Sequence, residues 1–167
     1  MSKRIEFFIK GREILAEPYH YVASGLPNIY LKNGVSMDTT SYGPMVTIEN
    51  LNGLHKAIGL HIIEKPKPMT GREFRFLRKQ MNLTQRSLAE QMHLSDQTIA
   101  NYEKNNTRNL GPADPLMRIQ FLLRVIPDET RAEILKLIAD AERGQKLPDV
   151  PRRKIVQSWQ ETLPAAA

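Results

Sequence analysis

The sequence predicts an α+β protein in which a small antiparallel β-rich domain precedes an all-α domain. Two observations support this prediction. Short apolar runs separated by turn residues fill the first 64 residues, which is typical of strands. From residue 69 to about 144, apolar residues recur three and four positions apart, which is typical of amphipathic helices. We therefore expect a β-rich domain at 1–64, a helical domain at 65–144 and a loosely ordered tail at 145–167.

Composition limits the class of protein. The chain has 167 residues, 41% of them hydrophobic, which is enough for a packed core. It contains no cysteine, and this excludes disulfides and zinc sites built on thiolates. No apolar run reaches the roughly 20 residues that a membrane span needs, and no signal-peptide apolar region is present. A cytoplasmic protein without a membrane partner is expected.

The positive charge of the chain is concentrated in one stretch. The net charge is +6, and residues 65–111 carry nine Lys/Arg against four Asp/Glu. Residues 1–64 carry six of each, so their net charge is zero. Scattered surface charge would not be distributed in this way. The pattern favours a polyanion partner for the helical domain.

Turn signals divide the first domain into short strands. Alternating apolar residues predict a strand over 4–10, and β-rich runs predict further strands at 19–22, 28–31 and 45–48. Asn33-Gly34 predicts a two-residue hairpin, because both positions of a type I′ turn need a positive φ. Asn50 is expected to cap a short helix that ends at Gly59, and 61–64 to form a final strand.

The stretch Lys65-Pro66-Lys67-Pro68 is expected to be an extended linker, because proline disfavours helix in the residue before it. Its two lysines either remain solvated or contact phosphate.

Five helices are expected after the linker, each with its own start signal. Thr70 and Glu73 form a capping box that opens the first helix. Thr84 caps the second helix, over 85–92, and Ser95 caps the third, over 96–104. Asp114, followed by proline, is expected to cap the fourth helix, which runs to about residue 125. A fifth helix follows and closes near residue 144. Whether Trp159 of the tail docks on a domain is left open.

The third helix carries the residues that we expect to contact DNA bases. Its apolar positions must face the core, so Asp96, Gln97, Ala100 and Asn101 face outward. Gln and Asn side chains can hydrogen-bond adenine bidentately in the major groove, and a carboxylate can accept from the amino group of cytosine. The small Ala100 lets the helix approach a thymine methyl. The alternative is that polar residues simply fill an exposed helix face.

Further polar residues around this helix are expected to contact phosphate. The start of a helix offers free backbone N–H groups to an anion, and Gln85 stands at the start of the second helix. Phosphate contacts set affinity and register but carry no sequence information. The expected phosphate contacts are Gln85, Arg86, Ser95, Thr98, Lys104, Asn105, Thr107 and Arg108.

The central stretch resembles the Cro/C1 (XRE) helix-turn-helix family of phage repressors. The resemblance rests on Leu83-Thr84-Gln85-x-x-Leu88-Ala89 and Leu94-Ser95-x-x-Thr98-Ile99-x-x-Tyr102-Glu103. It implies a lambda-repressor-like fold, phosphate contact by Gln85 and base contact by Asp96, Gln97 and Asn101. It also implies a structural salt bridge between Arg78 and Glu103.

One position departs from the family pattern. Family members usually have glycine in the turn where this chain has His93, because the backbone there tends to be left-handed. Histidine tolerates that region better than most residues, so we interpret His93 as a turn residue and not as a catalytic or metal-binding one.

The order of the two domains is weakly similar to MqsA-type antitoxins and their YgiT-like relatives, whose first module holds zinc with paired cysteines. Residues 19–30 resemble part of such a module without any cysteine, so metal binding is not carried over. His20, His55 and His61 lack the spacing of a metal site, and neither a metal nor a cofactor is expected. The sequence also lacks a cysteine nucleophile, a Gly-rich phosphate loop and a distinct carboxylate pair, so we do not expect an enzyme.

Three functional hypotheses follow. The first is a sequence-specific transcriptional regulator that acts as a repressor and binds an inverted repeat of double-stranded DNA as a homodimer. The alternative is an antitoxin that binds a toxin protein through its first domain and regulates its own operon. In the third, the first domain serves only for dimerisation or effector sensing.

Overall fold

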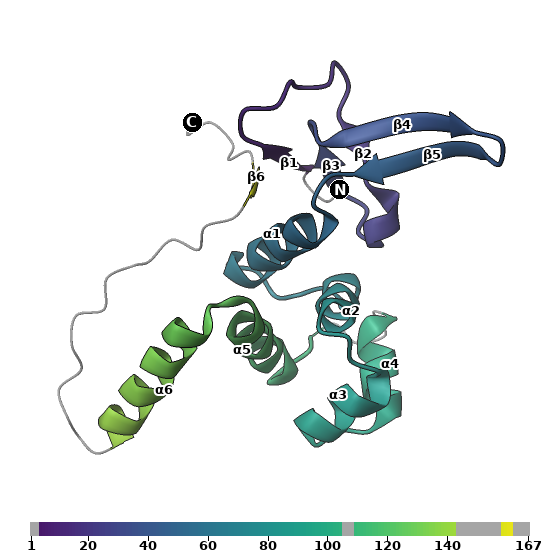
Figure 1. The fold of residues 1–167 in the computed structure, drawn as a ribbon. Coiled ribbons are helices and arrows are strands. Elements are labelled where there is room, and N and C mark those ends of the chain that lie inside the picture. The colour runs from purple at the N-terminus through teal and green to yellow at the C-terminus, as the bar shows by residue number, and fades with distance from the viewer. Residues whose placement is uncertain (1–3, 105–108, 143–157, 162–167) are drawn as a thin grey trace.

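The computed structural model describes residues 4–104, 109–142 and 158–161. A β-rich region comes first and a helical region follows it (Figure 1), so the predicted α+β fold class is confirmed. The first region contains β1 (Ile5–Ile9), β2 (Tyr19–His20), the 3-10 helix η1 (Val22–Ser24), β3 (Ile29–Leu31), β4 (Val35–Thr40), β5 (Gly43–Ile48) and α1 (Leu51–Glu64). The second contains α2 (Gly71–Gln80), α3 (Gln85–Met92), α4 (Asp96–Glu103), α5 (Ala113–Val125) and α6 (Asp128–Glu142), and β6 (Trp159–Glu161) lies in the tail.

The strands form two separate sheets. One has the order β2-β3-β1-β6, and the other is the β4–β5 hairpin. The pairs β2–β3, β1–β6 and β4–β5 are antiparallel, whereas β1 and β3 run parallel. Phe7, Ile29 and Leu31 are buried in the larger sheet and face a core that continues into the helices.

The strand β6 brings part of the tail onto the sheet. Trp159 pairs with Ile9, is fully buried, and its indole N–H donates to the carbonyl of Glu49 at 3.0 Å. Residues 158–161 therefore differ from the loosely ordered tail that we expected. Burying a large indole whose N–H finds an acceptor stabilises this docking. The other tail residues lie outside the described part of the chain.

The hairpin predicted at Asn33-Gly34 is wrong. Asn33 is absent from the residues with positive φ, so a type I′ turn cannot form there. Its buried amide instead accepts from the Ile9 N–H at 2.7 Å and donates to the Ile9 carbonyl at 3.0 Å. Gly34 has a φ of 68°, and a Cβ there would lie 2.7 Å from the ring of Trp159. These two residues serve the docking of β1 and β6.

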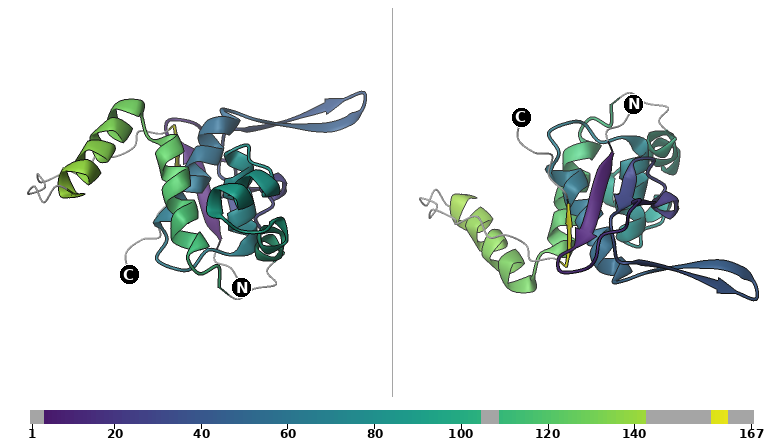
Figure 2. Two further views of the ribbon diagram at one scale, coloured as in Figure 1. Left: turned by 90° about the horizontal axis from the view of Figure 1, so that it is seen from below. Right: turned by 90° about the horizontal axis from the view of Figure 1, so that it is seen from above.

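The hairpin of the protein is the β4–β5 arm, residues 35–48, which projects away from the rest of the molecule (Figure 2). Cross-strand pairing places Met37 beside Val46, on the same face as the pair Val35 and Ile48 next to the core. Met37 and Val46 remain exposed at 65% and 40%. The apolar face of the arm therefore extends beyond the core into solvent.

The helix α1 is longer than predicted, and its predicted end at Gly59 is wrong. Residues 61–64 continue the helix instead of forming a strand. Gly59 is buried, and a Cβ there would lie 2.1 Å from the ring of Phe121 on α5. The glycine therefore permits close packing of α1 on α5, and this tertiary contact offsets its low helix propensity.

The start of α5 also differs from the prediction. The helix begins at Ala113, and Asp114 does not cap it. The Asp114 carboxylate accepts from the Met69 N–H at 2.6 Å and from Arg118. Burial alone would raise the pKa of Asp114, but these hydrogen bonds and the positive charge of Arg118 lower it overall.

Arg118 ties α5 to the linker between the two regions. Its guanidinium donates to the carbonyls of Ile63, Lys65 and Lys67 at 2.7, 3.0 and 2.8 Å. The Lys65 ammonium, for which phosphate contact was one alternative, instead pairs with Glu73 of the α2 capping box. Contacts thus run from α1 through the linker into α2 and α5, and the division into domains at 64 and 65 stays a prediction.

Candidate nucleic-acid interface

The helices α3 and α4 are joined by a tight turn, and each starts with a hydroxyl cap. Thr84 accepts from the Ser87 N–H at 3.0 Å, and Ser95 accepts from the Thr98 N–H at 3.1 Å. His93 lies in the turn with φ 54° and ψ 42°, so the predicted left-handed conformation is confirmed. The capping box of Thr70 and Glu73 on α2 is likewise confirmed.

Apolar side chains hold the three helices together. Leu88 of α3 and Ile99 of α4 are fully buried, and Phe74 of α2 meets Tyr102 of α4 edge to face with ring centroids 5.8 Å apart. This packing fixes which face of α4 points outward. A rotation of α4 about its axis would expose these apolar side chains and leave a gap in the core.

A buried ionic network connects α2, α3 and α4. Arg78 donates to both carboxylate oxygens of Glu103, with the Nη2–Oε2 distance at 2.9 Å. The third guanidinium nitrogen, Nη1, donates to the Leu83 carbonyl at 2.7 Å. The amide of Gln85 donates to the same Glu103 carboxylate at 2.9 Å. The first residue of α3 is therefore held in place, and one N–H of its amide remains available to a phosphate oxygen.

The three residues expected to contact bases lie together on α4. Asp96 and Gln97 are exposed and Asn101 is half-buried. The Gln97 amide donates to the Asn101 side-chain oxygen at 3.1 Å. This pair leaves the Gln97 oxygen as an acceptor and the Asn101 nitrogen as a donor, which is the combination that an adenine edge requires.

The residues expected to contact phosphate are spread over α3 and both ends of α4. The hydroxyls of Ser95 and Thr98 lie 2.9 Å apart at the start of α4. Arg86 pairs with Glu90 on the exposed face of α3 at 3.2 Å, and such exposed pairs are weak enough to be given up to a stronger partner. Lys104 is exposed at the end of α4. Asn105, Thr107 and Arg108 lie outside the described residues.

Sequence reasoning missed Arg75. It lines an opening of about 570 Å³ beside Gln85, Ala100 and Lys104, and its guanidinium reaches Glu103 only at 4.0 Å. The sequence could have indicated Arg75 through its position three residues before Arg78, since residues three apart share a face of a helix.

The histidines of the first region do not converge on one site. His20 contacts the Pro27 carbonyl, His55 the Tyr21 hydroxyl and His61 the Glu161 carboxylate. Within the residues described, no group of three or more His, Asp or Glu side chains is arranged to hold a metal ion. No helix in that part of the chain is long and apolar enough to cross a membrane.

Comparison with known proteins agrees with the geometry of the helices. Residues 71–140 match a family model described as a helix-turn-helix domain. No curated protein and no solved structure matched the chain significantly. The helical region is thus similar to helix-turn-helix domains over α2 to most of α6, and this similarity indicates a DNA-binding regulator.

Proposed function

We propose that the protein is a sequence-specific transcriptional regulator of the XRE type that represses its targets as a homodimer. The observation that carries this proposal is the exposed face of α4, where Asp96, Gln97 and Asn101 stand on a helix fixed by the buried Arg78–Glu103 pair. A rigid support of this kind favours base recognition, because base contacts tolerate little positional error.

Sequence is read by the three α4 residues in this proposal. The paired amides of Gln97 and Asn101 recognise adenine, and the Asp96 carboxylate selects cytosine through its amino group. A carboxylate at this position repels nearby phosphates, so Asp96 disfavours binding to sites that lack the cytosine contact.

Affinity comes from contacts to the DNA backbone. Gln85, Arg86 and Lys104 flank α4, and the positive charge of residues 65–111 surrounds them. In a homodimer, two-fold symmetry places the two α4 helices about one turn of DNA apart, which predicts an operator with inverted repeats.

The proposal is tested by selecting bound sequences from random DNA and then measuring affinity for the selected site. Gln97→Ala should relax the preference at one or two positions, with a cost of about 1–3 kcal/mol at the matched base. Lys104→Gln should weaken all sequences about equally and reduce the salt slope by about one. Lys136→Gln on the exposed face of α6 removes the same charge and serves as the matched control. Equal affinity for selected and scrambled DNA would refute the proposal.

The second candidate function is an antitoxin whose first region binds a toxin protein. The observation that favours a protein partner is the β4–β5 arm, which exposes Met37, Met45 and Val46 and has no Lys or Arg in residues 35–48. A surface of this composition suits a protein more than a phosphate backbone. Co-expression with the product of an adjacent small open reading frame tests it. Failure of Met37→Ser/Val46→Ser to weaken any complex recovered would count against this role of the arm.

A further inference from the structure

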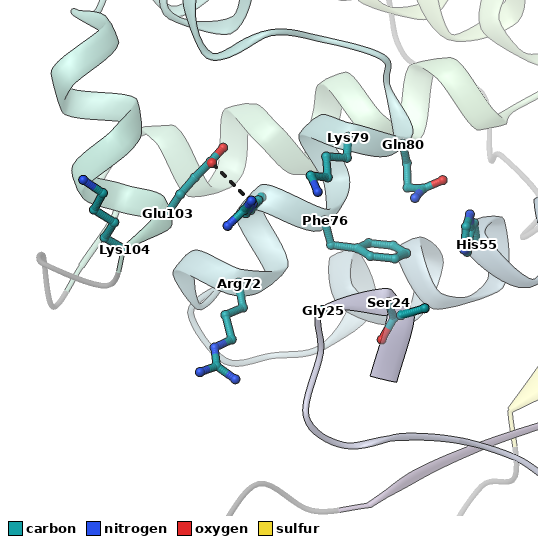
Figure 3. Close-up of a pocket in the computed structure, with 11 residues that line it drawn as sticks. Ser24, Gly25, His55, Arg72, Phe76, Lys79, Gln80, Glu103 and Lys104 are labelled. Carbon is teal, nitrogen blue, oxygen red and sulfur yellow. Dashed lines mark ion pairs between the residues drawn. The ribbon is translucent and has the colours of Figure 1, made fainter. Parts of the chain in front are cut away.

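A second concave surface lies beside the candidate DNA interface and shares Lys104 with it. This cavity of about 510 Å³, here called the α2 groove, runs along one face of α2 between the first region and the end of α4. Figure 3 shows its position between η1 and α1 on one side and α4 on the other. Its lining consists of Ala23, Ser24, Gly25, His55, Arg72, Arg75, Phe76, Lys79, Gln80, Glu103 and Lys104.

The charge of the α2 groove is strongly unbalanced. Arg72, Arg75, Lys79 and Lys104 line it. Among the described lining residues the single carboxylate is that of Glu103, which is already paired with Arg78. Three of the four cations, Arg72, Lys79 and Lys104, make no ion pair with any residue that the structure describes. Cations gathered in one groove with little compensation by carboxylates create a local positive potential.

The opposite wall is polar but uncharged. Burial lowers the pKa of His55 and favours the neutral imidazole, although a hydrogen bond with Gln80 opposes this shift. Its Nε2 contacts the Tyr21 hydroxyl at 2.8 Å, and Ser24 and Gly25 present small groups beside it. The buried Phe76 side chain also lines the groove. Among the described residues that line this side, none is acidic and opposes an incoming anion.

The chemistry of these groups selects the ligand. Guanidinium groups bind phosphate through two parallel hydrogen bonds, and ammonium groups bind it as point charges. The volume of the groove lies within the range of sites for small ligands, roughly 300–1,000 Å³, and exceeds what a lone monovalent ion fills. We propose that the α2 groove is an anion site that binds a phosphate group carried by a larger ligand.

A ligand in the α2 groove would contact both the first region and the end of α4. The lining of this groove comes from η1 and α1 of the first region, from α2 and from the end of α4. Arg75 and Lys104 line both this groove and the opening beside Gln85. A bound phosphate therefore connects the β-rich region with the helix that carries the candidate base contacts. Two sources supply this chemistry, the backbone of DNA flanking the operator and a free phosphorylated metabolite. The site does not depend on sequence-specific recognition by α4.

The test uses the full-length protein and inorganic pyrophosphate as the probe. Pyrophosphate is titrated into the protein at low salt, and the amide NMR shifts of Ser24, Gly25 and Gln80 report binding. The wild type should show saturable shifts at these residues, and Arg72→Gln/Lys79→Gln should weaken binding by about tenfold or more, since two charge-assisted contacts are lost. The charge-matched control Lys10→Gln/Lys136→Gln should bind as the wild type does. Arg72→Lys/Lys79→Arg keeps both charges and should retain binding, which separates ligand contact from folding.

A second arm distinguishes the two sources. Binding of a non-specific duplex is measured as a function of salt for the same variants. If flanking DNA supplies the phosphate, the slope of log affinity against log salt falls by about 0.9 for each lost contact in Arg72→Gln/Lys79→Gln and not in the charge-matched control. If a free metabolite supplies it, the slope is unchanged while pyrophosphate binding is lost. The proposal is overturned if pyrophosphate gives no saturable shifts at the reporters, or if the groove variant and the control lose binding equally.

Discussion

The buried pair of Arg78 and Glu103 gives the sharpest prediction about stability. Both residues are less than one tenth exposed, and Glu103 accepts hydrogen bonds from Arg78 and from Gln85. Glu103→Ala leaves a buried guanidinium whose remaining partner in the described structure is the Leu83 carbonyl. We expect the free energy of unfolding to fall by about 3–5 kcal/mol, because an uncompensated buried charge costs more than the lost contact alone.

Removing both charges should cost less than removing one. Arg78→Met/Glu103→Leu replaces the pair by apolar side chains of similar size, and such replacements of buried ion pairs are often neutral or stabilising. The assay is urea denaturation followed by circular dichroism for the wild type, both single variants and the double variant. The exposed pair Arg86 and Glu90 provides the control cycle, for which we expect a coupling below about 1 kcal/mol. If the double variant loses as much stability as the sum of the two single variants, the reasoning is refuted.

Three further predictions concern contacts that only the structure revealed. Gly59→Ala should lower the melting temperature although alanine has the better helix propensity, because the added Cβ meets the Phe121 ring. Overpacking of this kind typically costs about 1–3 kcal/mol. An unchanged or higher melting temperature would contradict this packing. Trp159→Ala should lower the free energy of unfolding by about 3–5 kcal/mol through loss of a buried indole, and a loss below about 1 kcal/mol would show that β6 does not dock in solution. The pKa of Asp114 in the folded protein lies below its ordinary value of 3.8. The ionised carboxylate therefore contributes fully to the free energy of unfolding above pH 3.8, and this contribution is lost as the pH falls through the folded pKa. Asp114→Asn should therefore flatten the acid limb of the curve of stability against pH, and an unchanged acid limb would show that another carboxylate controls it.

Much of the helix-turn-helix could be predicted because its signals are local. The caps Thr84 and Ser95 and the capping box of Thr70 with Glu73 each act within one turn of their own helix. Their structural roles follow from sequence spacing of three residues. The left-handed conformation of His93 could be predicted because this residue lies in the turn between two such helices. Local interactions of this kind change little with the rest of the fold.

The predictions that failed depended on distant residues. Gly59 was interpreted as a helix end from its own propensity, but its environment is set by Phe121, which lies 62 positions later in the sequence. Asn33-Gly34 was interpreted as a hairpin, whereas the Asn33 amide is bound by Ile9. Local turn preferences amount to only about 1 kcal/mol, and tertiary contacts of that size or larger override them.

The sequence by itself determined the α+β class, the positions of the helices α2 to α4 and the concentration of positive charge on residues 65–111. These properties are sums of local preferences and composition, which need no knowledge of the partners. Only the tertiary structure decided that Trp159 completes the first sheet, that Arg118 joins α5 to the linker, and that cations of α2 face η1 across a groove. Each of these depends on which distant segments meet, and that choice is made by packing the whole core at once.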